Sequence, residues 1–220
     1  KDPDKKGLIK DKIAVVYAVG AIQSGKGDDN TIGSERIAGA IRKARLDEHV
    51  KAVVLRVNSP GGSALASDVI WREVVLTRKA KPVVVSMGDV AASGGYYIAC
   101  AANKIIAQPN TITGSIGVFG LMYNAQKLMN NKLGITIDTF KTAKHADLGT
   151  PFRPLTPSER MIIQNSVERI YLSFISKVAE GRKMTTANVD SIGQGRVWSG
   201  VDAKRIGLVD ELGGMELAIN

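Results

Sequence analysis

The sequence of 220 residues has a single cysteine, Cys100, and only two histidines, His49 and His145. One cysteine excludes a disulfide framework and a zinc site built from cysteines. Two histidines are too few for a histidine-rich metal site. Aromatic residues make up only 5% of the chain, which is little for a surface that stacks nucleic-acid bases. We therefore expect no metal and no cofactor, and the hydrophobic content of 44% predicts a folded globular domain.

The net charge of +9 first suggests an acidic partner such as a nucleic acid. Acidic and basic residues alternate at helical spacing, however, for example around Arg42 and around Arg169. Such mixing is typical of a solvated helix face. We therefore expect no nucleic-acid binding.

One long segment has almost no charge. Residues 90–126 carry a single charged side chain, Lys104, and residues 105–126 carry none. This stretch is long enough to cross a membrane, which takes roughly 20 apolar residues. It contains glycines, Pro109 and several polar side chains, so we predict a buried segment and not a membrane span.

Residues 1–11 are rich in charge, and we predict that they form a linker or tether. They lack the apolar stretch of a signal peptide. We expect the chain to be a fragment of a longer protein, with residues 12–220 forming one domain.

Strand-like and helix-like segments alternate along the chain. Strands are expected at 13–19, 51–57, 82–87, 104–108, 134–140 and 196–198, and helices after Ser34 as N-cap, at 65–76, near 95, at 126–131, from Thr156 to about 181, and at 200–207. The long helix begins with a capping box, in which Thr156 and Glu159 each bind the other's backbone N–H. This order predicts an α/β fold with a parallel sheet, right-handed crossovers and a C-terminal helical portion.

Ser93 lies between small residues, directly after the third predicted strand and before a short helix. This pattern is similar to a nucleophile elbow, in which a sharp turn lifts the serine hydroxyl toward the substrate. The Gly94 N–H and the helix N-terminus would stabilise an oxyanion there. Taken alone, the segment fits a glycine-rich turn with an unreactive serine equally well.

A second glycine-rich loop, residues 58–62, follows the preceding strand. Its two glycines, Gly61 and Gly62, allow the backbone to approach a ligand closely and to point N–H groups into a site. Loops at the carboxyl ends of neighbouring parallel strands meet in the crevice where α/β folds place their sites. We therefore expect the two loops to form one site; the alternative is a turn that only leads into a helix.

Four segments carry motifs that occur together. They read LRVNSPGGS at 55–63, MGDVAASGGYYI at 87–98, TGSIGV at 113–118, and GRVWSG at 195–200 with GLVD at 207–210. In this order they resemble the signal peptide peptidase A (SppA) family of serine proteases, from about residue 13 to the end of the chain. The resemblance implies a ClpP/crotonase-like fold for residues 12–220, a Ser-Lys dyad, and membrane-anchored oligomers that cut signal peptides left after secretion.

The resemblance also implies a role for each matching residue. Ser93 would be the nucleophile, and the N–H groups of Gly61 and Gly94 would form the oxyanion hole. Ser115 would be a supporting hydroxyl near the general base.

The general base itself is missing from the matching position. In single-half members the lysine directly precedes an aspartate ahead of the long helix, where this chain has Ala146 before Asp147. The chain is then either the C-terminal half of a two-half member whose N-terminal half supplies the lysine, or a protein in which Lys144 reaches the site through a shifted loop, or a form that has lost activity. His145 is a weaker candidate base.

The resemblance implies a serine endopeptidase that degrades hydrophobic peptides such as cleaved signal peptides. It also implies a homo-oligomer that is membrane-associated through a missing N-terminal segment, with its soluble domain on the periplasmic or extracytoplasmic side of the bacterial inner membrane. One alternative is a catalytically inactive half that acts as an oligomer scaffold or peptide-binding module. Another is a crotonase-like acyl-CoA enzyme, which would need a carboxylate near the oxyanion glycines; none occurs between Val90 and Gln126.

Overall fold

The computed structural model describes residues 11–220, so the predicted linker lies almost wholly outside the described residues. The chain divides into two compact units. The first unit comprises the described residues up to Gly117 together with Ser173–Asn220, and the second comprises Val118–Leu172. One long helix, α5 (Pro157–Arg182), contributes residues to both units.

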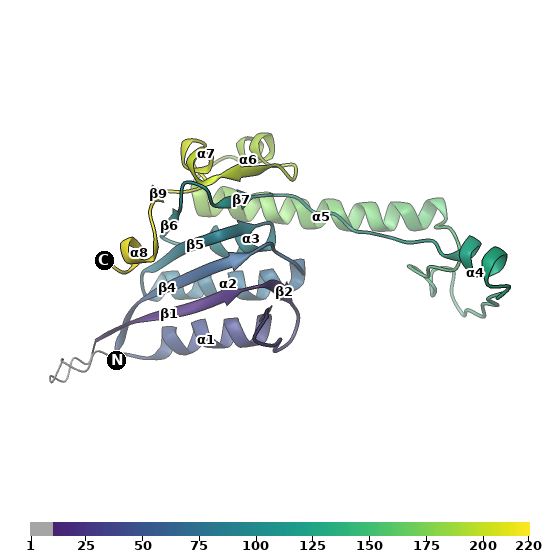
Figure 1. The fold of residues 1–220 in the computed structure, drawn as a ribbon, viewed down its shortest axis with the longest axis horizontal. Coiled ribbons are helices and arrows are strands. Elements are labelled where there is room, and N and C mark those ends of the chain that lie inside the picture. Colours follow the sequence, from purple (N-terminus) through teal and green to yellow (C-terminus); the bar gives the residue numbers. More distant parts are fainter. Residues whose placement is uncertain (1–10) are drawn as a thin grey trace. The chain divides into compact units, whose positions relative to one another are not determined.

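A sheet of seven strands forms the centre of the first unit within the described residues (Figure 1). Its path is β1-β4-β5-β6-β9, with β7 beside β5 and β8 beside β7, and every pair is parallel except β7 with β8. A separate parallel pair joins β2 and β3. The strands are β1 (Lys12–Val19), β2 (Ala21–Gln23), β3 (Thr31–Gly33), β4 (Val50–Ser59), β5 (Val83–Ala92), β6 (Lys104–Ala107), β7 (Ile112–Gly114), β8 (Val197–Ser199) and β9 (Glu211–Leu212). The predicted α/β class with a parallel sheet is confirmed.

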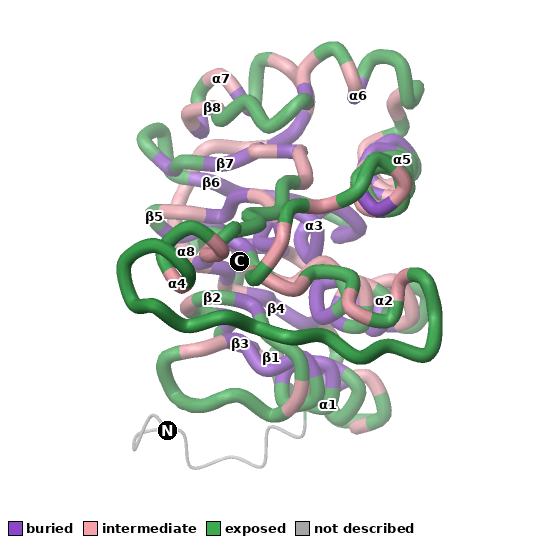
Figure 2. Tube along the Cα trace, turned by 90° about the vertical axis from the view of Figure 1, so that its right-hand side faces the viewer, coloured by how far each residue is buried: buried purple, intermediate pink, exposed green. Residues whose placement is uncertain are grey.

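Helices cover both faces of this sheet. Helices α1, α2 and α3 lie on one face (Figure 2), and α8 packs on the other, where Ala218 joins a cluster with Val54 and Ile106. The helices are α1 (Ser34–Leu46), α2 (Ala64–Ala80), α3 (Gly94–Ala99), α4 (Gln126–Lys132), α5, α6 (Thr186–Ile192), α7 (Gly200–Arg205) and α8 (Met215–Ile219). The N-cap prediction for Ser34 is wrong, because Ser34 is the first helical residue and Gly33 is the N-cap, without a side-chain hydrogen bond.

Helix α2 buries only part of the predicted apolar face, which comprises Leu65, Val69, Ile70 and Leu76. Ile70 is buried as predicted, but Leu65 and Val69 are 70% and 42% exposed. The buried stripe includes Ile70, Val74 and Thr77. These positions are three and four residues apart, so they share the side of the helix that packs inward.

Strand β5 changes neighbours along its length, and this positions the site. Its residues 84–86 pair with β6, whereas residues 90–92 pair with β7. Ser59 at the end of β4 lies opposite Ala91 near the end of β5. The carboxyl ends of the two strands are therefore neighbours, and they lead into the two glycine-rich loops.

The second unit has little regular structure besides α4 and the first part of α5. The strand predicted at 134–140 is wrong: these residues form no strand, and Ile135 and Ile137 are about half exposed. The segment alternates apolar and polar residues, but among the described strands none pairs with it. A strand needs such a partner to be stable.

The start of α5 matches the sequence prediction. The Thr156 N–H donates to Glu159 Oε2 at 2.8 Å, and the Glu159 N–H donates to Thr156 Oγ1 at 3.3 Å. The capping box is therefore confirmed.

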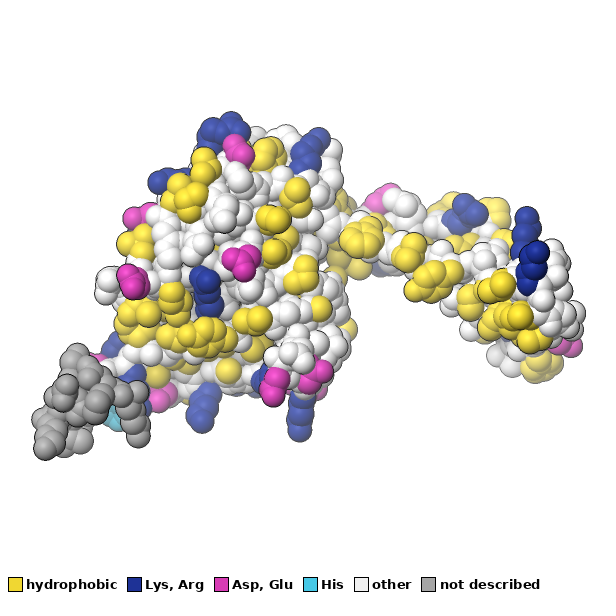
Figure 3. Space-filling model, viewed as in Figure 1, with side chains coloured by type: hydrophobic (Ala, Val, Ile, Leu, Met, Phe, Trp, Pro, Cys, Tyr) yellow, Lys and Arg dark blue, Asp and Glu magenta, His cyan; other side chains and the backbone are white. Residues whose placement is uncertain are grey.

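The charge-poor segment, residues 90–126, is largely buried up to Ile116 and mostly exposed beyond it. Ile105, Thr113 and Ile116 have no exposed surface, but Phe119 is 92% exposed. The predicted burial is therefore wrong for the residues that enter the second unit. Figure 3 shows hydrophobic side chains (yellow) on the surface of both units. Within residues 11–220, no helix is long and apolar enough to cross a membrane.

Candidate active site

Ser93 forms the turn between β5 and α3. Its backbone angles, φ 53° and ψ −119°, lie outside the regions that L-residues usually adopt. Such a conformation costs on the order of 1–3 kcal/mol and persists only where the surroundings hold it. The Ser93 N–H donates to the Gly114 carbonyl at 2.9 Å, and the Ser93 carbonyl accepts from the Tyr97 N–H at 2.9 Å. This sharp strand-to-helix turn is the geometry of a nucleophile elbow.

The glycine-rich loop after β4 lies directly against this turn. A Cβ atom on Gly61 would come within 2.6 Å of the Gly94 nitrogen and 2.9 Å of the Ser93 Cβ. A Cβ atom on Gly94 would lie 2.6 Å from Ser67 Oγ and 3.2 Å from the Gly62 nitrogen. Only glycine permits this approach, so the structure brings the two loops together at one place.

The candidate oxyanion donors differ in what their N–H groups bind. The Gly61 N–H donates to Ser59 Oγ at 3.1 Å, and that hydroxyl donates to the Gly20 carbonyl at 2.7 Å. The role predicted for the Gly61 N–H therefore conflicts with a hydrogen bond that it already makes inside its own loop. Among the described residues, nothing accepts from the Gly62 N–H. The Gly94 N–H belongs to the first turn of α3, where backbone donors have no acceptor within the helix.

Ser115 follows Gly114, the residue whose carbonyl binds the Ser93 N–H. It has a left-handed backbone with φ 48°, held by its N–H bond to the Arg196 carbonyl at 2.8 Å. Its hydroxyl lies 3.5 Å from the Gly195 carbonyl, which is a weak contact. The structure thus places a loosely held hydroxyl in the segment beside Ser93.

Lys144 is not part of the unit that contains Ser93. It belongs to the second unit, where its side chain is exposed and forms no ion pair with any described residue. Two residues later, Ala146 occupies the position where the resemblance expects lysine. The first unit by itself therefore contains Ser93 and both glycine-rich loops without Lys144.

An ionic cluster organises the loop around Ala146. Arg153 forms ion pairs with Asp147 at 2.8 Å and with the buried Glu159 at 2.6 Å. The Arg153 guanidinium, with help from Lys141, holds the pKa of Asp147 well below its usual range, and Arg153 does the same for Glu159. His145 lies beside the cluster, with Nδ1 3.8 Å from a Glu159 oxygen and no hydrogen-bond partner.

Sequence reasoning missed a polar cluster behind the Ser93 turn. The Lys177 ammonium on α5 contacts Asp68 on α2 and the Tyr97 hydroxyl on α3. These three residues are far apart in the sequence, so their types and spacing carry no signal. The only hint is a basic residue in a part of α5 whose neighbours Phe174 and Val178 are apolar.

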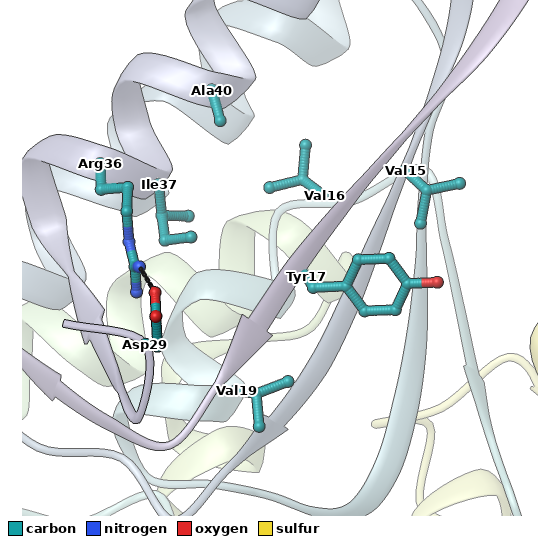
Figure 4. A pocket seen from close by; sticks show the side chains of 8 residues that line it. All are labelled: Val15, Val16, Tyr17, Val19, Asp29, Arg36, Ile37 and Ala40. Atoms are coloured by element: carbon teal, nitrogen blue, oxygen red, sulfur yellow. Dashed lines mark hydrogen bonds and ion pairs between the residues drawn. The ribbon is translucent and has the colours of Figure 1, made fainter.

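A pocket of about 430 Å³ lies away from these residues, between β1 and α1 (Figure 4). It is lined by Val15, Val16, Tyr17, Val19, Asp29, Arg36, Ile37 and Ala40. Neither Ser93 nor the glycine-rich loops contribute to it. In the part of the chain that the structure describes, no group of three or more His, Cys, Asp or Glu side chains is placed to hold a metal ion.

Two family comparisons match these elements. The sequence model of peptidase family S49 matches residues 76–220, and that of Clp protease matches residues 11–113. Together with the parallel sheet, the second match confirms the predicted ClpP/crotonase-like fold class.

Individual relatives match almost the whole chain. Protease 4 of Salmonella typhi is 48% identical over 208 residues, which are 94% of this chain and 33% of that protein. Serine protease SPPA, chloroplastic, of Arabidopsis thaliana is 44% identical over 215 residues, or 96% of this chain and 32% of that protein. Putative signal peptide peptidase SppA of Enterococcus faecium is 35% identical over 217 residues, or 95% and 62%. The chain therefore spans about a third of the length of the first two relatives.

Proposed function

The chain belongs to peptidase family S49, and on that premise we propose that it carries the nucleophile of a serine endopeptidase. One observation carries the proposal: the strained Ser93 turn meets a glycine-rich loop so closely that a single added methyl group would clash. Strain of this kind clusters at functional sites, because the surrounding structure must maintain it.

In the proposed reaction, Ser93 Oγ attacks the carbonyl carbon of a peptide bond while its proton passes to a lysine amine. The N–H groups of Gly62 and Gly94 stabilise the charge on the carbonyl oxygen, in place of the predicted pair of Gly61 and Gly94. The intermediate collapses to an ester on Ser93, and the amine fragment leaves with the proton. Water then hydrolyses the ester, and no cofactor takes part.

The lysine of the dyad is proposed to come from the N-terminal half of a two-half protein. A lysine that accepts a proton near neutral pH needs a lowered pKa, which burial or a nearby positive charge provides. Lys144 is exposed in a different unit from Ser93, and Ala146 has no amine. The length of the Salmonella and Arabidopsis relatives, about three times that of this chain, is consistent with a second half.

The proposed substrates are hydrophobic peptides such as cleaved signal peptides. The name of the Enterococcus relative, putative signal peptide peptidase SppA, supports this, as does the low charge of residues 90–117 around Ser93 and Ser115. We further propose a homo-oligomer that is membrane-associated through a segment outside residues 11–220, with this chain on the extracytoplasmic side of the bacterial inner membrane.

Hydrolysis of a hydrophobic peptide by the natural protein in full tests the proposal. Ser93→Ala is expected to lower kcat by at least about 10³-fold, because the covalent route is lost. Ser191→Ala, at an exposed serine of α6 whose hydroxyl donates to the Asn188 carbonyl of the same helix, is the matched control and should retain activity. Unchanged hydrolysis by Ser93→Ala would refute the assignment.

A second candidate function is a catalytically inactive half that binds peptides or supports an oligomer. Ala146 at the expected lysine position favours it. This alternative predicts peptide binding without hydrolysis, even in the natural protein in full, so the same assay separates the two.

A further inference from the structure

We propose that Lys177 is a positioning residue for Ser93 and acts through Tyr97; this inference rests on the proposed role of Ser93 as nucleophile. Lys177 lies on α5, Tyr97 on α3 and Asp68 on α2, and all three belong to the first unit. Nothing in the family motifs includes Lys177 or Asp68.

A single set of contacts joins the three helices. The Lys177 ammonium donates to Tyr97 Oη at 2.8 Å and to Ser173 Oγ at 3.0 Å, and it forms an ion pair with Asp68. The Tyr97 hydroxyl donates to the same Asp68 oxygen at 2.8 Å. Removing Lys177 would take one hydrogen-bond partner from the Tyr97 hydroxyl and would remove the ion pair that joins α5 to α2 at this point.

Tyr97 transmits this arrangement to Ser93. The Tyr97 N–H donates to the Ser93 carbonyl at 2.9 Å and closes the first turn of α3. Helix α3 has only six residues, so its own hydrogen bonds cannot fix its direction. The Tyr97 ring is 5% exposed and packs on Phe174 with ring centroids 4.7 Å apart. A shift of Tyr97 therefore shifts the Ser93 turn.

Asp68 connects the same cluster to the part of α2 that lies against Gly94. It follows Ser67, whose hydroxyl lies 2.6 Å from the place of a Cβ atom on Gly94. The cluster thus holds both the turn that carries Ser93 and the part of α2 that lies against Gly94.

Lys177 acts by position and does not accept the Ser93 proton. Burial lowers its pKa, but the hydrogen bonds to Asp68 and Tyr97 outweigh burial and raise the pKa above the usual value. The ammonium also lies 4.5 Å from the centre of the Trp71 ring, a contact that favours the charged form. A lysine held in this way keeps its proton.

The test measures Ser93 phosphonylation by a fluorophosphonate, together with kcat and KM for a peptide, in the natural protein in full. Lys177→Met is expected to slow phosphonylation and lower kcat by on the order of tenfold or more, with KM changed less than about twofold, because misplacement affects the reacting atoms more than binding. Lys177→Arg should recover most of the rate. Lys204→Met, at an exposed lysine of α7, is the matched control and should react at the unsubstituted rate.

A double-substitution cycle distinguishes positioning through Tyr97 from a general loss of stability. Lys177→Met and Tyr97→Phe together are expected to react no more slowly than the slower single variant, whereas independent effects would multiply. Tyr97→Phe alone remains informative if Lys177→Met does not fold.

An unsubstituted rate in Lys177→Met, or multiplicative effects in the cycle, would overturn the inference and leave the role of Ser93 intact. No phosphonylation of Ser93 in the unsubstituted protein would overturn both.

Discussion

At the scale of single residues, the site depends on backbone positions that leave no room for a side chain. Gly61 has a φ of +100°, and a Cβ atom added to it would lie only 2.6 Å from the Gly94 nitrogen. Gly94 in turn leaves room for the Ser67 hydroxyl. Backbone atoms therefore surround the Ser93 turn closely, and in the proposed reaction this absence of side chains lets a substrate carbonyl approach the N–H groups.

Gly61→Ala tests this arrangement against Gly25→Ala. Both glycines have positive φ, but an added Cβ meets nothing within 4 Å at Gly25. Gly25→Ala is expected to lose about 1–2 kcal/mol of unfolding free energy through backbone strain alone, and Gly61→Ala is expected to lose more because its Cβ atom also clashes with the Ser93 turn. Only Gly61→Ala should also lose peptidase activity, by at least about 100-fold. Urea unfolding and peptide hydrolysis measure the two effects, and equal activity in both variants would contradict the steric argument.

The sequence pointed to candidate residues that stand out by type, such as a serine and glycines after predicted strands. It did not reveal residues whose interaction partners are far away in the sequence. Ser93, Gly61 and Gly94 stand out because small residues follow predicted strands. The choice between the Gly61 and Gly62 N–H groups depends on one hydrogen bond to Ser59, which no spacing reveals. Lys177 and its partners come from three separate helices, so only the folded chain brings them together.

At the scale of elements, α3 is held by close packing against α5. A Cβ atom on Gly181 would lie 2.0 Å from the Cys100 carbonyl oxygen. Arg78 on α2 donates to the Ala101 carbonyl at 2.9 Å and holds the end of α3 from the other side. The helix that carries Ser93 at its N-terminus therefore has its C-terminal end fixed by two neighbouring helices, α2 and α5.

Gly181→Ala and Gly39→Ala should change stability in opposite directions. Gly181→Ala forces α3 and α5 apart and is expected to cost about 2–3 kcal/mol or more. Gly39 lies on the exposed side of α1 with open space around it, so Gly39→Ala should stabilise by roughly 0.5–1 kcal/mol. Thermal unfolding of both variants checks the signs, and a stable Gly181→Ala would contradict the close contact.

The Arg153 cluster in the second unit predicts a pH dependence of stability. The folded-state pKa values of Asp147 and Glu159 are lowered from 3.8 and 4.5, so their ionised forms stabilise the fold above about pH 4.5. This stabilisation is lost as the pH falls through and below that range. Arg153→Met removes its source.

Urea unfolding at several pH values measures this dependence. Arg153→Met is expected to be less stable than the unsubstituted protein at pH 6, and the difference should shrink between pH 4.5 and pH 3. Arg160→Met is the control, because Arg160 is an exposed arginine in the first turn of α5, close in sequence to Arg153. A difference that stays constant down to pH 3 would contradict the proposed origin.

The elements of the first unit were predictable because burial enforces their pattern. Runs of valine identified β4 and β5, and in the second unit the capping box identified the start of α5. The segment 134–140 has the alternation of a strand, yet pairing is a tertiary property and no partner is present among the described residues. Leu65 and Val69 misled for the same reason, since an apolar side chain does not reveal which neighbour is available.

At the scale of the whole molecule, the second unit exposes more apolar surface than a lone soluble unit needs. Phe119 and Phe140 are 92% and 96% exposed, and Leu121 and Tyr123 are both 73% exposed. Large apolar side chains exposed in this way are typical of interaction sites. The surface is consistent with the proposed homo-oligomer.

Phe119→Ser combined with Phe140→Ser is expected to lower the apparent mass of the natural protein in sedimentation velocity. The reason is that each phenylalanine would be desolvated in a contact between copies. Leu46→Ser, at an exposed leucine of α1, is the control and should leave the mass unchanged. An unchanged mass in the double variant would count against the second unit as the site of assembly.

Labelling with a fluorophosphonate shows directly whether Ser93 is the acylated nucleophile. The natural protein in full is treated with the reagent, digested, and mapped by tandem mass spectrometry. We predict a single phosphonylated serine, Ser93, and complete loss of labelling in Ser93→Ala. A modified serine elsewhere, or labelling that persists in Ser93→Ala, would contradict it.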